Sequence, residues 1–358
     1  MTTKIKSLLN LSVASTLALS LGHGLATAQD ADQGDEDARR FGTVTVTAQR
    51  REQNALDVPL SVSAFSGEDL EATGAVDITS IQRATPNATI EVARGSNSTL
   101  IAFIRGVGQQ DPLWGFEPGV GLYVDDVYIA RPQGAILDIF DIDRIEVLRG
   151  PQGTLYGRNT IGGAIKYVTS RMGSEPDLKA KINLGTFNQA DLILSGSTPI
   201  GETFAVGGAI ARYTRDGFGE NLNTGAEHYD KDVLAYRLSA EWMPSDNFFV
   251  RASYDRTEDD SNAKHGHRLL PSADGTLPVT SNVFDTRAGL GDDNSVETEG
   301  YSLTAEWTVS DMVTLKSITA YREGETTTPI DFDALPQPDF DVPAVYADDQ
   351  FSQEFQLL

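Results

Sequence analysis

Few side chains in this sequence are spaced for metal or thiol chemistry. The chain has 358 residues and no cysteine, which excludes disulfides, thiol catalysis and cysteine-ligated metals. His265 and His267 lie in an acidic loop with Asp259 and Asp260. Histidine pairs in loops are mostly solvated, and a metal centre needs a further ligand set that this loop lacks. We therefore expect no metal site.

Groups for acid–base or nucleotide chemistry are equally sparse. Asp125 and Asp126 are adjacent carboxylates, but a turn between two strand-like segments explains them better than catalysis. Gly106, Val107 and Gly108 lack the third glycine and the following helix of a dinucleotide-binding loop. We predict neither enzymatic activity nor a cofactor. The net charge of −24 also argues against nucleic acid, which binds clustered lysine and arginine.

The first residues have the pattern of an export signal. Lys4 and Lys6 precede an apolar run over residues 8–21, and a small-residue cleavage motif ends at Ala28. The apolar run is too short for a membrane anchor. We therefore expect residues 1–28 to be a removable signal peptide. No later stretch resembles a transmembrane helix, so membrane insertion would require a closed β-barrel.

A β-prone segment lies inside a flexible arm, residues 29–52. The first part of the arm is polar and charged, as in disordered segments. Threonine and valine then alternate through Thr43, Val44, Thr45, Val46 and Thr47. We expect this segment to find no pairing partner nearby, so that it could add as a strand to another protein. It could equally be the first strand of the next domain.

Residues 53–172 have the pattern of a small mixed α/β domain. Ser66 can cap a helix in which Asp69 completes a capping box, and Asp77 can cap a second short helix that ends near residue 83. The expected strands are residues 58–65, 89–92, 100–105, 121–124, 127–130, 144–148 and 164–169.

Residues 173–358 alternate apolar and polar side chains in eight long segments. In one segment Leu238 and Trp242 share an apolar face, opposite Arg237 and Glu241. Such segments fit a soluble sandwich, which buries the apolar face, or a membrane barrel, which presents it to lipid. The segments are residues 179–187, 190–198, 203–214, 232–243, 248–257, 297–309, 312–323 and 350–358.

The lengths of the connections favour the barrel. Short turns alternate with long loops, as in outer-membrane barrels, whose apolar face contacts lipid. The turns are residues 199–203, 244–247 and 310–311, and the loops are residues 215–231, 258–296 and 324–349. Aromatic girdles would be formed by Trp242, Phe248, Trp307 and Tyr321. We predict an antiparallel transmembrane β-barrel in contact with outer-membrane lipid.

One stretch carries a family resemblance. Residues 144–171 read RIEVLRGPQGTLYGRNTIGGAIKYVTSR, which closely resembles the end of the plug domain of TonB-dependent outer-membrane receptors. IRGVG at 104–108 and GLYVDDVYIAR at 121–131 resemble other plug segments, and TVTVTAQRRE at 43–52 resembles the TonB box and its linker. The resemblance covers residues 41–358.

This resemblance implies an α+β plug domain followed by a barrel, which has about 22 strands in such transporters. It implies that the β-prone segment of the arm binds TonB, which energises import of a scarce ligand. The default ligand is an iron–siderophore complex. The alternatives are cobalamin, a sugar or another nutrient, or a truncated fragment that binds ligand without transport. The short interval after Ala28 leaves no room for a periplasmic signalling domain.

The resemblance also implies two sets of plug residues. Arginines are expected to be buried and paired with carboxylates such as Glu146, and glycines to permit tight turns. This structural and gating set is Arg105, Gly106, Glu146, Arg149, Gly150, Gly153, Gly157 and Arg158. Outward-facing loops would hold the ligand through aromatic and polar groups. These substrate-binding candidates are Arg94, Gln109, Gln110, Asp111, Trp114 and Phe116. The alternative to ligand binding is that these loops are simply solvated and that Trp114 packs on the barrel wall.

Eight segments are too few to close a barrel around such a domain, because small barrels are filled by their own side chains. We therefore expect a complete plug with an open, curved sheet of about eight strands. The last segment stops in mid-pattern at Leu358, without the closing strand and terminal aromatic of full-length family members. A sheet of this size alone would transport nothing.

Overall fold

The computed structural model describes residues 45–135, 141–337 and 339–358. The expected signal peptide lies outside the described residues, as do Thr43 and Val44. Within the described residues, no helix combines the length and the apolar character needed to cross a membrane.

The first part of the described chain forms a mixed α/β domain, which we call the plug. Ser66 caps its first helix and exchanges hydrogen bonds with Asp69, and Asp77 caps a 3₁₀ helix, so both predicted helix starts are confirmed. The plug elements are β1 (Thr45–Val46), β2 (Gln53–Asn54), β3 (Ser61–Ser66), α1 (Gly67–Ala72), η1 (Ile78–Ala84), β4 (Ala88–Val92), β5 (Leu100–Ile104), β6 (Val107–Gly108), β7 (Val120–Val124), β8 (Val127–Ile129), β9 (Ile142–Arg149), α2 (Gly153–Tyr156) and β10 (Gly163–Thr169).

The plug is built on a five-stranded sheet in the order β3-β9-β10-β7-β8. Only β7 and β10 run parallel to each other. Asp125 and Asp126 form the predicted turn between β7 and β8, with φ angles of 46° and 67° that suit a tight hairpin. Ile104, Ile145 and Ile165 are fully buried at the centre of the domain. The plug therefore has an apolar core of its own.

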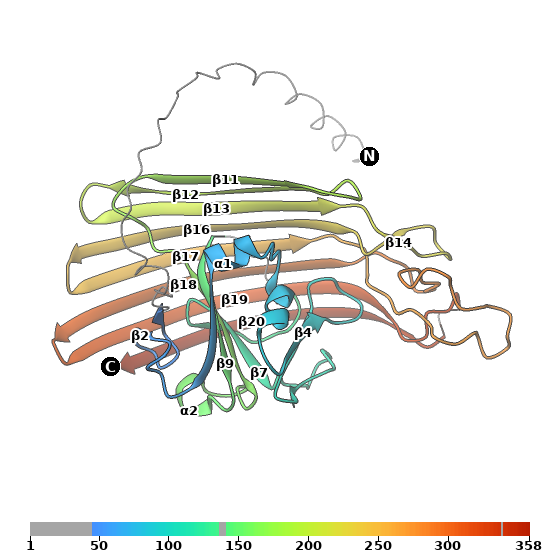
Figure 1. Cartoon of the computed structure of the whole chain (residues 1–358), viewed down its shortest axis with the longest axis horizontal. Coiled ribbons are helices and arrows are strands. Elements are labelled where there is room, and N and C mark those ends of the chain that lie inside the picture. The colour runs from blue at the N-terminus through green and yellow to red at the C-terminus, as the bar shows by residue number, and fades with distance from the viewer. Residues whose placement is uncertain (1–44, 136–140, 338) are drawn as a thin grey trace, which may run out of the picture. The chain divides into compact units, whose positions relative to one another are not determined.

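The rest of the described chain forms one open antiparallel sheet, which we call the wall (Figure 1). Its strands follow in chain order, and β11 and β20 are the two edges, as predicted for a partial barrel. The wall strands are β11 (Asp177–Leu184), β12 (Ala190–Ile200), β13 (Phe204–Arg215), β16 (Lys231–Ser245), β17 (Phe248–Asp259), β18 (Ser295–Ser310), β19 (Val313–Asp331) and β20 (Asp341–Leu357). A small hairpin, β14 (Gly219–Glu220) and β15 (Glu227–His228), lies in the connection between β13 and β16.

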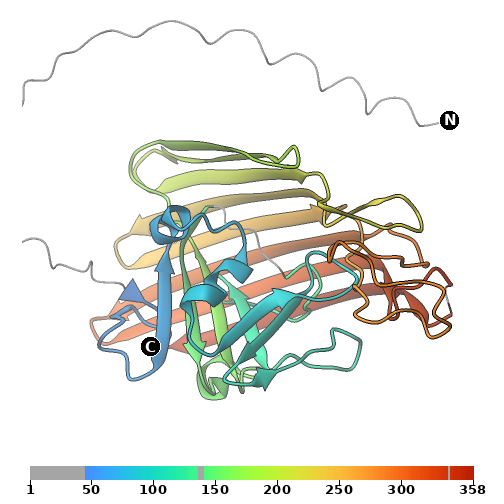
Figure 2. The same ribbon diagram turned by 45° about the vertical axis from the view of Figure 1, so that its right-hand side comes forward.

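The two faces of the wall differ in character. Leu238, Trp242 and Trp307 are exposed on one face. Ala235 and Ile318 are buried on the other, which contacts the plug (Figure 2). The predicted alternation is confirmed, because the apolar side chains that face away from the plug form a surface suited to lipid.

The last two wall strands are longer than predicted. Pairing of β19 with β20 runs from Leu315 opposite Leu357 to Asp331 opposite Asp341. The expected segments 312–323 and 350–358 were therefore too short, and the expected loop 324–349 shrinks to the few residues between the strands. The reason lies in a run of threonines near residue 327, which favours β-structure but lacks an apolar alternation that a sequence pattern could detect.

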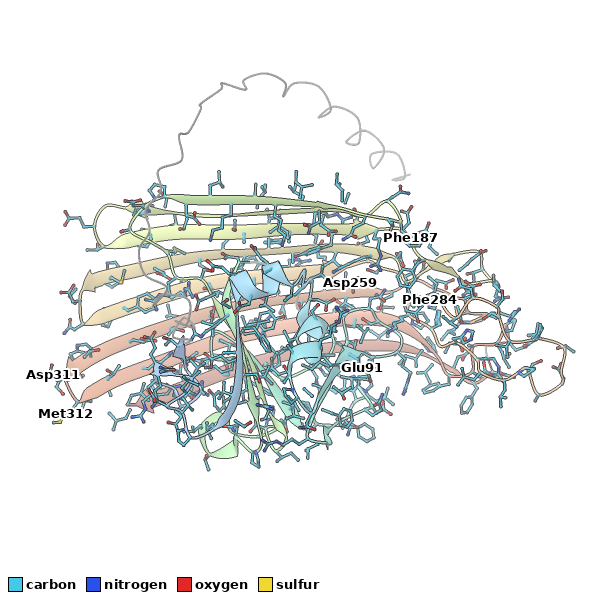
Figure 3. All side chains as sticks on the ribbon, viewed as in Figure 1. Glu91, Phe187, Asp259, Phe284, Asp311 and Met312 are labelled. Carbon is cyan, nitrogen blue, oxygen red and sulfur yellow. The ribbon has the colours of Figure 1, made fainter. Side chains whose placement is uncertain are left out.

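Long loops and short turns lie at opposite ends of the wall. Phe187 and Phe284 lie at the loop end, whereas Asp311 and Met312 form a turn at the other end (Figure 3). In outer-membrane barrels the long loops are extracellular and the short turns periplasmic. We name the two ends of this wall the loop end and the turn end.

Candidate functional site

The described part of the arm is paired within the chain. Thr45–Val46 forms an antiparallel pair with Gln53–Asn54. Val46 and Ala48 are 0% exposed and pack against the plug, where the Tyr156 hydroxyl donates to the Ala48 carbonyl at 3.0 Å. The expectation that this segment finds no local partner was wrong. The chain doubles back within a few residues, so that this segment pairs with the start of the plug sequence just after it.

Thr47 is held by two buried ionic groups of the plug. The carboxylate of Glu146 accepts hydrogen bonds from the Thr47 N–H at 2.8 Å and from its hydroxyl at 3.1 Å. The Lys166 ammonium donates to the Thr47 hydroxyl at 2.7 Å and to its carbonyl at 3.1 Å. Glu146 is 0% exposed and Lys166 is 1% exposed. Arg144 also donates to Glu146, at 2.8 Å. The end of the β-prone segment is therefore fixed by charge-assisted hydrogen bonds.

Arg50 links the arm to both the plug and the wall. Its guanidinium contacts Asp126 of the plug at 2.9 Å and Glu354 of β20 at 3.3 Å. It also lies over the ring of Tyr156, with 4.1 Å between the guanidinium carbon and the ring centroid. The stacking adds a cation–π contribution to the ion pairs. Both contacts suit the planar side chain of arginine.

Asp126 lies at the centre of this network. Besides Arg50, it contacts the ammonium groups of Lys166 at 3.3 Å and of Lys316 on β19 at 3.0 Å. Burial alone would raise the pKa of Asp126, but Lys166, Lys316 and Arg50 together hold that pKa well below its usual range. We name the group formed by these residues the arm cluster: Thr47, Arg50, Asp126, Glu146, Lys166, Lys316 and Glu354.

The arginines expected to pair with Glu146 lie elsewhere. Arg105 is exposed, and Arg158 is exposed and reaches only Glu117, at 3.9 Å. Arg149 is partly buried and donates to the Pro86 carbonyl at 3.4 Å. This corrects the prediction of buried arginine–carboxylate pairs. In this fold alternate residues of β9 point to opposite faces, so Arg144 shares the face of Glu146 whereas Arg149 does not.

The glycines of the same set have different roles. Gly106, Gly150 and Gly157 have positive φ angles of 78°, 110° and 80°. Gly153 begins α2 with no such requirement. Only the first three need the conformational freedom of glycine at a turn.

A second contact joins the end of the plug to the wall. The Arg251 guanidinium on β17 donates to the Thr169 hydroxyl at 2.9 Å and to the Ser170 carbonyl at 2.5 Å. It also pairs with the buried carboxylate of Glu241 at 2.8 Å. The Arg171 guanidinium approaches Glu241 at 3.4 Å. The plug is thus attached to β16 and β17 as well as to β19 and β20.

Most of the predicted ligand-contacting residues are linked by contacts with one another or with the last two wall strands and their loop. Trp114 and Phe116 are 48% and 47% exposed. Arg131 stacks on Trp114 at 3.8 Å, and the Trp114 ring lies 6.2 Å from that of Tyr346 on β20. Trp114 therefore packs on the wall and also remains accessible, and its contact with a ligand stays a prediction.

The remaining candidates of this set are polar. Arg94 pairs with Asp111 at 3.4 Å and stacks on Phe332 of the wall's last loop at 4.7 Å. The Gln109 side chain accepts from the Asp111 N–H at 3.1 Å, and Gln110 is exposed. Gln109, Asp111 and Phe116 line one pocket together with Arg131, which stacks on Trp114. We call this group, with Arg94, the apex; Gln109 and Asp111 also stabilise their own loop.

Three carboxylates of the last wall loop lie close together. One carboxylate oxygen each of Asp331, Asp333 and Asp341 lies within 4.8 Å of the others. Asp331 accepts backbone hydrogen bonds from Ala334 at 2.6 Å and from Gly289 at 2.9 Å. These bonds explain the cluster as part of a loop turn.

Two histidines join the long loops at the loop end. His228 uses both ring nitrogens: Nδ1 bonds the Phe284 carbonyl at 2.7 Å, and Nε2 accepts from the His265 N–H at 2.9 Å. The His228 ring is therefore neutral, with its proton on Nδ1. Burial lowers its pKa, and the nearby His265 and Lys264 lower it further, although the Phe284 carbonyl and Asp292 oppose this.

We predict that acid loosens this loop packing. A histidine whose folded-state pKa is lowered stabilises the fold at pH values above its ordinary pKa of 6.5, and this contribution is lost as the pH falls through the lowered value. Proteolysis of residues 260–294 should therefore accelerate between about pH 7.5 and about pH 5. His228→Gln should remove most of the pH dependence, and His267→Gln should retain it. Equal acceleration in His228→Gln would contradict the assignment.

The chain resembles known proteins over its plug and over larger parts of its length. A family model described as the TonB-dependent Receptor Plug Domain matches residues 54–164. The vitamin B12 transporter BtuB of Vibrio vulnificus (strain CMCP6) is 30% identical over 210 residues, which make up 57% of this chain and 31% of that protein. An iron-regulated outer membrane virulence protein of Vibrio cholerae serotype O1 is 34% identical over 174 residues, 44% of this chain and 24% of that protein. The chain thus spans less than a third of the length of these relatives.

Solved structures share the arrangement of plug and wall. The ferric yersiniabactin uptake receptor FyuA of Yersinia pestis has a TM-score of 0.67 at 23% identity, covering 83% of this chain and 45% of that one. The pyoverdine outer membrane receptor FpvA of Pseudomonas aeruginosa PAO1 has a TM-score of 0.71 at 18% identity, covering 90% of this chain and 46% of that one. At these identities the likeness establishes the fold.

Proposed function

Because the chain belongs to the TonB-dependent receptor family, whose members lie in the Gram-negative outer membrane, we propose that it carries the arm and plug of an importer energised by TonB. The arm cluster is the observation that carries this proposal. It holds the arm at Thr47 and Arg50 and extends through Asp126 to Lys316 and Glu354 of the wall.

The arm cluster supports a gating mechanism. Movement of β19 or β20 changes the surroundings of Asp126 and Arg50, and through them the hold on Thr47. Once Thr47 is released, the backbone of residues 43–47 can offer its N–H and C=O groups to TonB as an added strand. Ligand bound on the apex, where Trp114 contacts Tyr346 of β20, would start this movement.

The first candidate for the ligand is an iron–siderophore complex. It is supported by relatives whose names refer to iron regulation and to ferric yersiniabactin uptake. Cobalamin is supported by the vitamin B12 transporter, and a sugar or another nutrient remains the alternative ligand class. A fragment that binds ligand without transport is the alternative activity.

Deletion of residues 41–48 in the intact receptor tests the proposal. We expect energy-dependent uptake to be lost, because TonB has no strand to pair with, while ligand binding at the cell surface persists. Deletion of residues 29–36 removes an equally long polar stretch and should leave uptake intact. Growth of a deletion strain on iron chelates, vitamins and glycans identifies the ligand for the uptake assay. Persistent energised uptake without residues 41–48 would refute the proposal.

A further inference from the structure

A short segment between β9 and β10 contacts both the arm and the loop that carries most of the apex. It comprises residues 153–162 and begins with α2, which Figure 1 labels close to β9. We call it the connecting segment, and we call residues 109–119, between β6 and β7, the apex loop. Both lie within the plug, so a link between them does not depend on the wall.

The start of the connecting segment holds the arm. The Tyr156 hydroxyl donates to the Ala48 carbonyl at 3.0 Å, and the Leu155 carbonyl accepts from Nε and Nη2 of Arg50 at 3.3 and 3.2 Å. The Arg50 guanidinium also lies over the Tyr156 ring, where a cation–π contribution adds to the hydrogen bonds. The arm is therefore held by α2 as well as by the carboxylates of the arm cluster.

The end of the connecting segment is bound to the apex loop through main-chain contacts. The Gly162 N–H donates to the Gly119 carbonyl at 2.8 Å, and both glycines are buried. A Cβ atom added at Gly162 would lie 3.1 Å from that carbonyl oxygen and 2.7 Å from the carbonyl oxygen of Val107. So close an approach of two backbones needs glycine. A shift of the apex loop at this point therefore displaces the connecting segment.

Asn159 adds a side-chain contact between the same two elements. Its amide donates to the carboxylate of Glu117, the residue after Phe116 of the apex, and to the Tyr128 hydroxyl at 2.9 Å. The backbone of Asn159 is left-handed, with a φ angle of 64°, a conformation that asparagine and glycine tolerate better than most residues. Asn159 therefore combines a tight turn with a contact to the apex loop.

Internal hydrogen bonds brace the connecting segment. The Thr160 hydroxyl donates to the Gly157 carbonyl at 2.7 Å, and the Thr160 carbonyl accepts from the Gln152 N–H at 2.9 Å. The Gly157 N–H donates to the Gly153 carbonyl at 3.0 Å. Thr160 is buried, so its bonds are shielded from water. A closely packed and internally bonded segment transmits a displacement from one end to the other.

Three tyrosine rings form a second connection. The Tyr123 ring lies 5.4 Å from the Tyr128 ring and 5.2 Å from the Tyr156 ring. The Tyr123 hydroxyl donates to the Tyr156 carbonyl at 2.7 Å, and the Tyr123 side chain is buried. Tyr128, which accepts from Asn159, is thereby packed through one buried ring onto Tyr156, which holds the arm.

We propose that the connecting segment couples the position of the apex loop to the retention of the arm, with Asn159 as the positioning residue on the apex side and Tyr156 on the arm side. A shift of the apex loop that breaks the contact between Asn159 and Glu117 displaces α2 and weakens its hold on the arm. The inference rests on the proposed import function, for which it names the regulation of the arm. Unlike the arm cluster, this route needs no movement of β19 or β20.

Thiol labelling of the purified intact receptor in detergent tests this coupling without a ligand. Position 48 is 0% exposed, so the rate at which a maleimide modifies the Ala48→Cys variant reports release of the arm. Asn159→Gly removes the amide and suits the left-handed backbone. We expect it to speed labelling about fivefold, the effect of losing roughly one hydrogen bond. This effect would reach the arm indirectly, since the Asn159 amide donates to Glu117 and Tyr128.

A cycle with Tyr156→Phe separates coupling from general destabilisation. Tyr156→Phe removes the hydrogen bond to the Ala48 carbonyl, keeps the ring beneath Arg50 and should itself speed labelling. If the route passes through Tyr156, adding Asn159→Gly should then change the rate by less than about twofold, because residues of one network do not act additively. Two effects that multiply in full would overturn the proposal.

Asn87→Gly is the matched control. Asn87 is exposed, directly precedes β4 and has a φ angle of 59°, so the same substitution in the same backbone conformation should leave labelling unchanged. Glu117→Ala, at an exposed side chain, should speed labelling at least about twofold and keeps the test valid if Asn159→Gly fails to fold.

The inference is overturned if neither Asn159→Gly nor Glu117→Ala speeds labelling, or if Asn87→Gly speeds it as much. Failure of the import proposal would show separately, as uptake that survives deletion of residues 41–48, and would leave these labelling rates unaffected.

Discussion

Replacing Asp126 with asparagine is expected to release the arm and to lower the plug's free energy of unfolding by about 3–5 kcal/mol, the range for breaking a buried ion pair. The change removes the anion that faces Arg50, Lys166 and Lys316, whose side chains are 5%, 1% and 15% exposed. Cations so deeply buried cannot regain full hydration. Urea unfolding of the detergent-solubilised receptor measures the loss, and trypsin cleavage near Arg50 and Arg51 measures release of the arm.

Asp57→Asn is the matched control, because Asp57 is an exposed aspartate of the plug with no role in the arm cluster. Its effect should stay within about 0.5 kcal/mol, as for ordinary surface positions. An Asp126→Asn receptor with normal stability and a protected arm would show that the ion pairs around Asp126 do not hold the arm.

The arm cluster should also be insensitive to mild acid. The pKa of Asp126 is lowered, so its stabilising contribution is present above the ordinary value of 3.8 and is lost only as the pH falls through the lowered pKa. Retention of the arm should therefore persist near about pH 5, where the packing around His228 is already weakened. The arm cluster and the packing around His228 lie at different places in the chain, and acid weakens them in different pH ranges.

Replacing Glu146 with glutamine should have the second largest effect. Glu146 is 0% exposed and serves Thr47, Arg144 and Lys166. Loss of the Glu146 charge leaves the buried Lys166 ammonium with one fewer anion nearby. We expect the free energy of unfolding to fall by about 3 kcal/mol or more. Thr47 loses a charge-assisted acceptor at the same time, so the arm should be cut faster by trypsin.

A double-mutant cycle separates the contribution of the Glu146–Lys166 contact from other effects of the two substitutions on stability. Lys166→Met alone leaves Glu146 with Arg144 as its cation partner, whereas Glu146→Gln with Lys166→Met removes both charges of the pair. We expect the double variant to lose at least about 1 kcal/mol less than the sum of the single losses, since contacting residues couple. Glu71→Gln, at an exposed carboxylate of α1, should be neutral. Additive losses in the cycle would exclude a direct role for the Glu146–Lys166 contact.

Local patterns account for the parts of the fold that the sequence predicts well. The caps at Ser66 and Asp77 depend on residues a few positions away, and the turn at Asp125 and Asp126 depends on two adjacent residues. The wall strands are predicted from the alternation of apolar and polar side chains along each strand, in which Leu238 is one of the apolar positions. Such features are determined within short stretches of chain.

The arm cluster could not be predicted in this way. Its members come from the arm, three plug strands or turns and two wall strands, up to 304 residues apart in the case of Arg50 and Glu354. Asp126 looked like a turn residue, and it is one, but the same turn aims its carboxylate at three cations. Family resemblance pointed to Arg105, Arg149 and Arg158, whereas the register of β9 and β10 buries Glu146 and Lys166 side by side.

We propose that the arm cluster keeps the arm buried against the plug until TonB binds it, and thiol labelling tests this proposal most directly. These 358 residues contain no cysteine, and Ala48→Cys introduces a thiol at a position that is 0% exposed. We predict that this thiol reacts slowly with a maleimide in the otherwise native receptor, and at least about tenfold faster when Asp126→Asn is added, since about 1.4 kcal/mol corresponds to a factor of ten. Thr45→Cys, at an exposed position, should react quickly in both backgrounds. If the thiol of the Ala48→Cys variant reacted equally fast with and without Asp126, the result would contradict the claim.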